Sequence, residues 1–500
     1  MSTEKNVSMM LPSESASRRN FLLSNAMSAG SVALAWLLKQ DGLVAEPIKP
    51  DIGPQNFSLA VQSPHRPPRA QAMISLFMQG GPSQMDLFDP KPELNKHDGQ
   101  QYSDDVHYDN LAEASSTLMG SRWRFRKRGQ CGTEISDLLP HIGTIVDDIT
   151  LIRSMHCPDS GHNTSVRAIN TGRVQLGRPS LGSWLLYGLG SESQELPAFV
   201  VLPDPRALPL DGTDNWSSGW LPSIYRGTLA RSRDPRILNL DPPRHLKGPA
   251  QRRYLSYLES LNRAHLKRHP GEQELDARIR NYELAARMQS AAREAFDIST
   301  ETKETLRLYG VGEKYTNEFG TRCLIARRLV ERGVRFVQLH VIGNAWDHHQ
   351  MIGRLLPGSC IQRDKPSAGL VKDLKRRGLL NSTLVHWGGE MGRLPVIQNN
   401  TSPKDRGRDH NQHAFSMWLA GGGIKAGHVH GQTDEFGHHG IKDRVSHNDY
   451  QATLLHLFGL DHKRLAFKFN AQERSLIDKQ PCRIVHEILK NSPGKRNLRG

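Results

Sequence analysis

The 500-residue sequence contains few cysteines, and none of them belongs to a recognised pair. The five thiols are widely spaced, their number is odd, and no CxxC motif is present. This pattern argues against a disulfide framework and against a zinc site built from thiolates. A single disulfide, formed in an oxidising compartment, stays open.

Long apolar runs are also missing after the first forty residues, and no nucleic-acid-binding motif is present. Hydrophobic residues make up 37% of the chain, with enough concentrated runs for a sizeable core. Basic residues outnumber acidic ones by 66 to 51, but they are scattered along the chain. We therefore expect a solvated basic surface and no nucleic-acid partner, with affinity for acidic polymers or lipids left open.

The amino terminus carries the segment SRRNFLLSNAMSAGSVALAWLL, Ser17–Leu38. It resembles a twin-arginine export signal, in which Arg18 and Arg19 precede a modestly apolar stretch. Export of a folded protein would suit a metal or cofactor that is loaded beforehand. We expect a periplasmic or secreted protein. Cleavage after Ala45 is imperfect, so an uncleaved membrane anchor is the alternative.

Elements along the chain predict one large domain. Residues 1–45 form the signal segment, 46–70 a proline-rich linker, 71–490 the domain, and 491–500 a basic tail. A helical insertion is expected over about residues 250–310. Apolar runs at Ala72–Gly81, Asp147–Met155, Pro197–Pro203, Gly333–Val341, Ser382–Glu390 and Ala414–Gly423 are typical of buried strands. Because helices separate several of them, we predict an α/β fold with a doubly wound, mostly parallel sheet.

Polar clusters lie beside the ends of these strands. Thirteen of the 23 histidines lie between His340 and His462. Open α/β sheets bind ligands at the carboxyl ends of strands, and imidazole with carboxylate suits zinc, manganese or iron. The three clusters are Asp347/His348/His349, Glu390 in GGEMGR, and Asp409/His410/His413. Each of them alone could be a hydrated or hydrogen-bonded structural group, but together they predict a shared metal site.

Two earlier segments add candidates. In SGHNTSVRAINTGR, His162 and Thr164 precede a short helix that ends near Arg173, and a helix amino end favours anions. An ordinary helix cap would explain the same residues. In QGGPSQMDLFDPKP, paired glycines would let backbone N–H groups approach an anion. There Asp86 and Asp89 either reach a metal or fix the turn.

The segments LFMQGGPSQMDLFDPKP, WDHH, GGEMGRLP, GRDHNQHAFSMWLAGGGIKAGHVHGQTDE and NDYQATLLHLFGLDHKRL together resemble an exported bacterial family. It is the family called domain of unknown function fifteen-oh-one (DUF1501). The resemblance covers nearly the whole chain, and it implies an alkaline phosphatase/sulfatase-like fold. Metal ions at the carboxyl ends of strands would then activate a nucleophile and neutralise a phosphate or sulfate ester.

This resemblance implies a role for individual residues. Asp347 and His349, completed by His410 or His413, match one metal position. At the other position the sequence departs from the pattern. Gln79 replaces the acid after the first strand unless Asp86 substitutes for it, and Glu390 stands where an Asp-His pair is expected. His162 occupies the position of the nucleophile, as nucleophile or ligand, with Thr164 as the alternative. Arg173 or Arg393 would bind the anion, and Glu390 would serve a second metal or act as a base.

We therefore expect an exported hydrolase of small or polymeric sulfate or phosphate esters. It would depend on a divalent metal, with zinc expected and manganese or calcium also suited to the site. The missing acid and imidazole support a second hypothesis, a non-catalytic member that acts as a binding or structural partner in an exported complex. In that case a protein partner is expected, and binding of acidic polysaccharide is compatible with either hypothesis.

Overall fold

The computed structural model describes residues 36–37, 40–41, 57–104, 106, 115–269, 273–343, 345–398, 402 and 404–490. The chain forms two units, Met1–Gln55 and Asn56–Gly500, and the second unit contains the sheet and the helices that pack on it. The twin-arginine motif, the expected cleavage site and the basic tail lie outside the described residues, so export stays a prediction. Within the described residues, no helix is long and apolar enough to cross a membrane.

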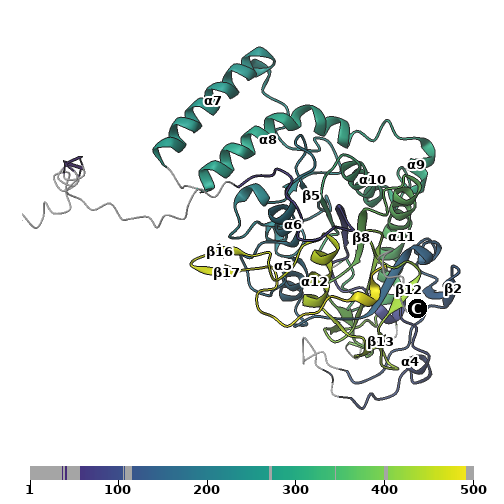
Figure 1. The fold of residues 1–500 in the computed structure, drawn as a ribbon. Coiled ribbons are helices and arrows are strands. Elements are labelled where there is room, and N and C mark those ends of the chain that lie inside the picture. The colour runs from purple at the N-terminus through teal and green to yellow at the C-terminus, as the bar shows by residue number, and fades with distance from the viewer. Residues whose placement is uncertain are drawn as a thin grey trace, which may run out of the picture. The chain divides into compact units, whose positions relative to one another are not determined.

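A nine-stranded sheet forms the centre of the second unit (Figure 1). Every neighbouring pair of strands is parallel except the two pairs that include β11. This confirms the predicted α/β fold with a mostly parallel sheet. The strand order is β12 (His428–His430), β4 (Ile149–His156), β11 (Phe415–Ala420), β8 (Thr383–Gly388), β1 (Ala72–Phe77), β7 (Phe336–His340), β5 (Phe199–Leu202) and β6 (Thr228–Leu229), and β15 (Val445–Ser446) pairs with β4.

Helices cover both faces of the sheet, because both faces of its central strands are apolar. In β1, Ile74 and Leu76 belong to one core cluster, whereas Met73 and Phe77 belong to the other. The first cluster contains apolar side chains of α10 (Asn317–Glu331) and α11 (Ile352–Arg376). The second contains side chains of α5 (His162–Thr171), α6 (Leu181–Leu189) and α12 (His447–Leu457). The sheet is therefore doubly wound, as predicted.

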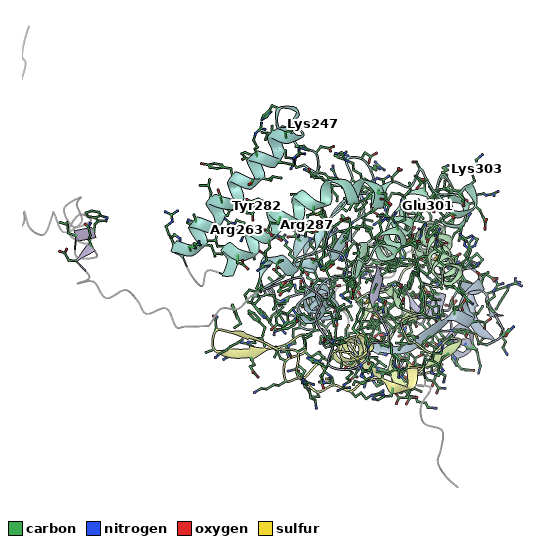
Figure 2. The ribbon with its side chains drawn as sticks, turned by 45° about the horizontal axis from the view of Figure 1, so that its top comes forward. Lys247, Arg263, Tyr282, Arg287, Glu301 and Lys303 are labelled. Atoms are coloured by element: carbon green, nitrogen blue, oxygen red, sulfur yellow. The ribbon has the colours of Figure 1, made fainter. Side chains whose placement is uncertain are left out.

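Three helices occupy the segment in which the helical insertion is expected. They are α7 (Pro249–Arg268), α8 (Gln273–Phe296) and α9 (Lys303–Leu308). Figure 2 shows α7 beside α8, with Arg263 on the first helix and Tyr282 and Arg287 on the second. No residue of α7 is buried, whereas α8 contributes Met288 and Phe296 to the core. Packing against the sheet domain therefore involves α8.

Short elements connect these layers. They are α3 (Gln84–Leu87), α4 (Pro92–Lys96), β2 (Phe125–Arg128), β3 (Thr133–Ser136), β9 (Gly392–Arg393), β10 (His410–Asn411), β13 (Gln432–Thr433), β14 (Gly440–Lys442), β16 (Phe467–Phe469) and β17 (Gln472–Arg474). The loops after β1, β4, β7 and β8 all leave the sheet at one edge, since these strands run in the same direction. Because β11 runs the opposite way, the segment that precedes it lies at that edge too. Loops from five strands therefore meet there.

Candidate metal centre

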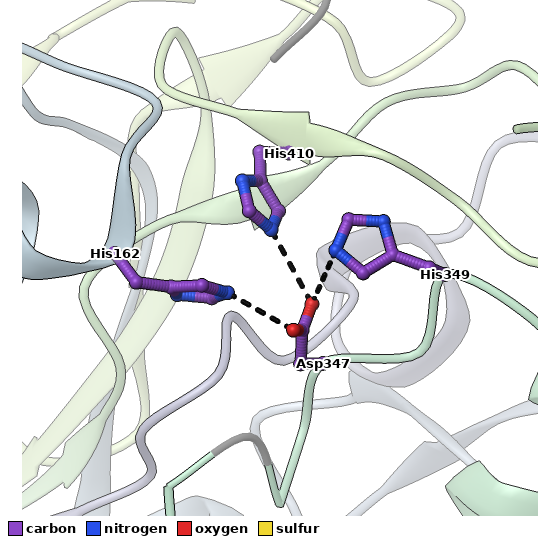
Figure 3. Close-up of side chains that lie close together, drawn as sticks. All are labelled: His162, Asp347, His349 and His410. Atoms are coloured by element: carbon purple, nitrogen blue, oxygen red, sulfur yellow. Dashed lines mark hydrogen bonds and ion pairs between the residues drawn. The ribbon is translucent and has the colours of Figure 1, made fainter. Parts of the chain in front are cut away.

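Three imidazoles surround one carboxylate at this edge of the sheet (Figure 3). His162 Nε2 lies 3.3 Å from Asp347 Oδ2, and His349 Nε2 lies 2.8 Å from Asp347 Oδ1. His410 Nε2 lies 3.3 Å from the same Oδ1 atom. One donor atom from each of the four residues can be chosen so that all lie within 4.8 Å of one another. All three histidines thus turn the same ring nitrogen toward Asp347.

Strand direction explains why these residues meet. Asp347 and His349 follow β7, and His162 follows β4 as the first residue of α5. His410 precedes β11 and reaches the same edge only because β11 is antiparallel. Gly80, with φ of 113°, lets the loop after β7 approach closely, since a Cβ there would lie 2.7 Å from the Trp346 nitrogen. A side chain at this glycine would push the Asp347 loop outward.

The second ring nitrogen of two histidines is held by an acceptor. His162 Nδ1 lies 2.6 Å from Glu390 Oε1, and Glu390 itself accepts hydrogen bonds of 2.9 and 3.2 Å from the Gly80 nitrogen. His349 Nδ1 is bonded to Gln398 Oε1. Such outer contacts fix the tautomer and the ring orientation of metal-ligating histidines. Both rings are therefore oriented with Nε2 free to face Asp347.

Nearby charges set the protonation of this cluster. Burial would raise the pKa of Asp347, but the Arg393 guanidinium at 2.6 Å and the three imidazoles hold it well below its usual value. Burial lowers the pKa of His410 to about 3. Burial also acts to lower the pKa of His162, but hydrogen bonds with Asp347 and Glu390 outweigh it and raise that pKa to about 9. Without a cation, Asp347 is ionised and His162 is a positively charged imidazolium near neutral pH.

The donor set fits a divalent transition metal. Imidazole nitrogen and carboxylate oxygen are both zinc ligands, and three or four such groups make a usual zinc site. A cation would replace the proton on His162 and balance the carboxylate. Three of the side chains are nearly buried, whereas His349 is 30% exposed. Solvent or a ligand can therefore reach the cluster on the side of His349.

Two histidines predicted near the site point elsewhere. His348 is buried, its Nε2 lies 3.4 Å from Ser359 Oγ on α11, and burial lowers its pKa to about 3. The His413 ring lies beside that of His439, tilted by 40°, with ring centroids 4.8 Å apart. Of the two late histidines that the sequence offered, the structure thus brings His410, and not His413, to Asp347.

The carboxylates near the first strand lie outside the cluster. Asp86 is buried and pairs with Arg408, whose Nε lies 2.8 Å from Oδ2. Asp89 pairs with Lys91 at 3.1 Å. Both carboxylates are therefore satisfied by basic side chains, and neither belongs to the group around Asp347.

Two other candidates, Thr164 on α5 and Arg173 beyond its end, do not belong to the cluster. The Thr164 hydroxyl donates to the carbonyl oxygen of Gly161 at 2.9 Å. Arg173 follows the last residue of α5, whereas His162 is its first residue. A helix of ten residues spans about 15 Å, so the backbone of Arg173 lies at the opposite end of α5 from His162. Arg393, by contrast, contacts Asp347 directly.

Sequence reasoning missed the partner of His349. Gln398 lies in the loop between β9 and β10, where the sequence has no regular pattern. The departure at Gln79 was visible from the sequence, and the structure shows its consequence. Both polar atoms of this fully buried amide have no hydrogen-bond partner among the residues that the structure describes. An unpaired buried amide is costly, which marks the position as unusual.

These observations define an α/β protein with an aspartate-histidine cluster at the carboxyl edge of its sheet. Residues 70–489 match the family described as Protein of unknown function (DUF1501), and the chain belongs to that family. This confirms the family expected from the sequence motifs. No curated protein matches the chain in sequence.

Several solved structures are similar to this chain in their overall fold. A sulfatase, PsFucS1, from Pseudoalteromonas sp. is 13% identical, with 78% of this chain and 68% of that chain covered and a TM-score of 0.34. The phosphonate monoester hydrolase SpPMH from Silicibacter pomeroyi is 10% identical, with 72% and 73% covered and a TM-score of 0.30. The alkaline phosphatase from the Antarctic bacterium TAB5 is 9% identical, with 79% and 99% covered and a TM-score of 0.29.

Proposed function

We propose that the protein is an exported, metal-dependent hydrolase of sulfate or phosphate esters. The observation that carries this proposal is the convergence of three imidazole Nε2 atoms on the Asp347 carboxylate. The substrate class comes from the sequence motifs, which resemble the alkaline phosphatase/sulfatase superfamily. A bound divalent ion would supply a positive charge that polarises the ester and activates water. Zinc is the ion we expect, because three of the four donor groups are imidazoles, and manganese or calcium is the alternative.

We assign His162 to metal binding rather than to nucleophilic attack. Glu390 holds its Nδ1, and its Nε2 faces Asp347, which is the arrangement of a ligand supported by an outer carboxylate. The Thr164 hydroxyl proton is committed to a backbone carbonyl. With both candidate nucleophiles engaged, the attacking group would be water. Glu390 is fully buried, so its part is to orient His162.

The substrate anion would approach the first turn of α5. Helix amino ends present N–H groups without intrahelical acceptors, and these favour sulfate and phosphate groups. Gly161, the residue before α5, provides no capping side chain. Arg393 is 1% exposed and donates to the carbonyl oxygens of Gly81 and Arg408 as well as to Asp347. We therefore assign Arg393 to holding the carboxylate in place.

Removal of metal gives the first test. We expect purified protein to contain about one or two equivalents of a divalent metal and to hydrolyse 4-nitrophenyl sulfate or 4-nitrophenyl phosphate. Dialysis against a chelator should abolish turnover, and added zinc should restore it, as measured by elemental analysis and nitrophenol release. Protein that lacks metal and turns over neither ester would contradict the proposal.

Replacement of Glu390 by glutamine tests how His162 is oriented. The variant keeps the size of the side chain but loses the charge that holds His162 Nδ1 at 2.6 Å. We expect zinc affinity to fall by about 10- to 100-fold, which is the usual cost of removing such an outer partner. Competition with a zinc-binding dye would measure it. Asp211→Asn is the matched control, because Asp211 also pairs with α5, but through Arg167.

One observation favours a second function. The charge on Asp347 is already balanced by Arg393, so the cluster does not require a metal in order to fold. Together with Gln79 at the position of the expected acid, this supports a non-catalytic member that binds a partner in an exported complex. Metal-free, inactive protein that co-purifies with one fixed partner would favour this alternative.

A further inference from the structure

A second group of histidines lies apart from the centre around Asp347 and shares no residue with it. His438 and His439 lie in the loop between β13 and β14, and His413 lies two residues before β11. Their rings are close, with centroids 3.9 Å apart for His438 and His439 and 4.8 Å apart for His413 and His439. Asp104, from the segment that follows α4, completes the group. Asp104, His438 and His439 form a donor set typical of zinc, and the His413 ring lies beside them.

The donor atoms are close enough to share one ion. One atom from each of Asp104, His438 and His439 can be chosen so that all three lie within 4.8 Å of one another. Two ligands that bind zinc at about 2.0–2.2 Å lie at most about 4.4 Å apart, so small movements would suffice. Asp104 is exposed and His439 is partly exposed, so an ion could enter from that side.

Hydrogen bonding around His438 leaves one nitrogen without a partner. The Tyr102 hydroxyl donates to Asp104 Oδ2 at 3.0 Å, since a carboxylate can only accept. The same hydroxyl lies 3.2 Å from His438 Nδ1, so it accepts the Nδ1 proton. In a neutral imidazole the lone pair is then on Nε2. His438 is 1% exposed, and this Nε2 atom has no hydrogen-bond partner among the described residues.

The loop that carries the two histidines is fixed from within. The Asp434 carboxylate accepts hydrogen bonds from the backbone nitrogens of Phe436 and His438 at 3.0 and 2.9 Å. The side chain of Asn411 donates to the His438 carbonyl oxygen at 2.8 Å. The backbone that carries both imidazoles is therefore held in place before any ligand arrives. Preorganisation of this kind lowers the entropic cost of binding.

We propose that Asp104, His438 and His439 bind a divalent transition metal of the zinc class at a second site, with the His413 ring beside them. The lone pair on His438 Nε2 then has a partner, and the charge of Asp104 is balanced. The ion links the β13–β14 loop to the segment after α4, which is far away in the sequence. This proposal does not depend on the hydrolase function, because it concerns other residues.

Zinc counting on the full chain tests the second site. We expect His438→Gln/His439→Gln to lose about one equivalent of zinc relative to wild type, because both imidazole ligands are gone. Asp347→Ala should keep that equivalent. The matched control is His428→Gln/His430→Gln, another pair of neighbouring histidines, whose ring centroids lie 6.2 Å apart. This control should retain the wild-type zinc content.

A second variant keeps the test valid if the double variant does not fold. Asp104 is exposed, so Asp104→Asn should fold normally, and we expect it to weaken zinc binding at this site by about tenfold or more. Binding is measured by dialysis, with Co²⁺ absorption as an independent probe of coordination. A folded His438→Gln/His439→Gln protein with unchanged zinc content would overturn the proposal, as would Asp347→Ala protein without zinc. Loss of ester hydrolysis in Asp347→Ala alone bears only on the first site.

Discussion

Asp347→Ala should remove the metal of the first centre and, with it, the activity. All three imidazoles of the first centre face this carboxylate, so it supplies the negative charge and one of the ligands. We expect zinc affinity to fall by at least about 100-fold. Ester turnover at fixed zinc should fall roughly 100- to 1,000-fold, as when a main electrostatic group is removed from an active site. Dialysis and nitrophenol release measure the two effects.

The same substitution should destabilise the metal-free protein. Arg393 is 1% exposed, and Asp347 is the carboxylate that balances its charge. Removing one partner of a buried pair leaves an uncompensated charge and costs about 3–5 kcal/mol. Because Asp347 keeps part of its exposure, we expect the lower end of this range in urea unfolding.

A matched control separates stability from metal binding. Arg178 is almost as buried as Arg393, and it pairs with Asp478 at 2.8 Å on another part of the surface. Asp478→Ala should therefore lose stability as well, but it should keep its zinc and its turnover. If both variants lost activity equally, the effect of Asp347→Ala would reflect folding alone, and the assignment of the centre would be wrong.

The fold could be predicted because several of its strands are short, mainly apolar runs that stand out in the sequence. Runs such as the AMISLF of β1 and the FVQLH of β7 are buried along their whole length, which is typical of parallel strands between two helical layers. The direction of β11 could not be predicted, since an isolated apolar run does not reveal whether the strand is parallel. This direction matters, because it brings His410 to the site from the amino end of its strand.

The candidate site was only partly readable from the sequence. Asp347 and His349 are adjacent to a strand end, so the rule for ligand sites in α/β sheets placed them. Arg173 lies beyond the far end of α5, whereas His162 is the first residue of that helix. The partners of Asp86 and His349 depend on side-chain directions in irregular loops. No local pattern in the sequence records them.

Asp86→Ala is expected to have the largest effect on stability outside the centre. Its carboxylate accepts hydrogen bonds from Nε and Nη2 of Arg408, at 2.8 and 3.3 Å, and both side chains are buried. Truncation would leave the Arg408 guanidinium, which is fully buried, without its counter-charge, at a cost of about 3–5 kcal/mol. Replacing the pair by apolar side chains, in Asp86→Leu/Arg408→Met, should recover much of that loss. Urea unfolding of the single and double variants measures it.

The conservative variant Asp86→Asn decides between a structural role and a metal-binding role for this residue. Its amide oxygen can still accept from Arg408 and from the Ser83 hydroxyl, which lies 2.6 Å from the carboxylate. We expect a smaller loss of stability than in the alanine variant and an unchanged zinc content. A folded Asp86→Asn protein that had lost an equivalent of zinc would instead identify Asp86 as a ligand, in place of the acid missing at Gln79. The short loop between them would then have to rearrange when the metal binds.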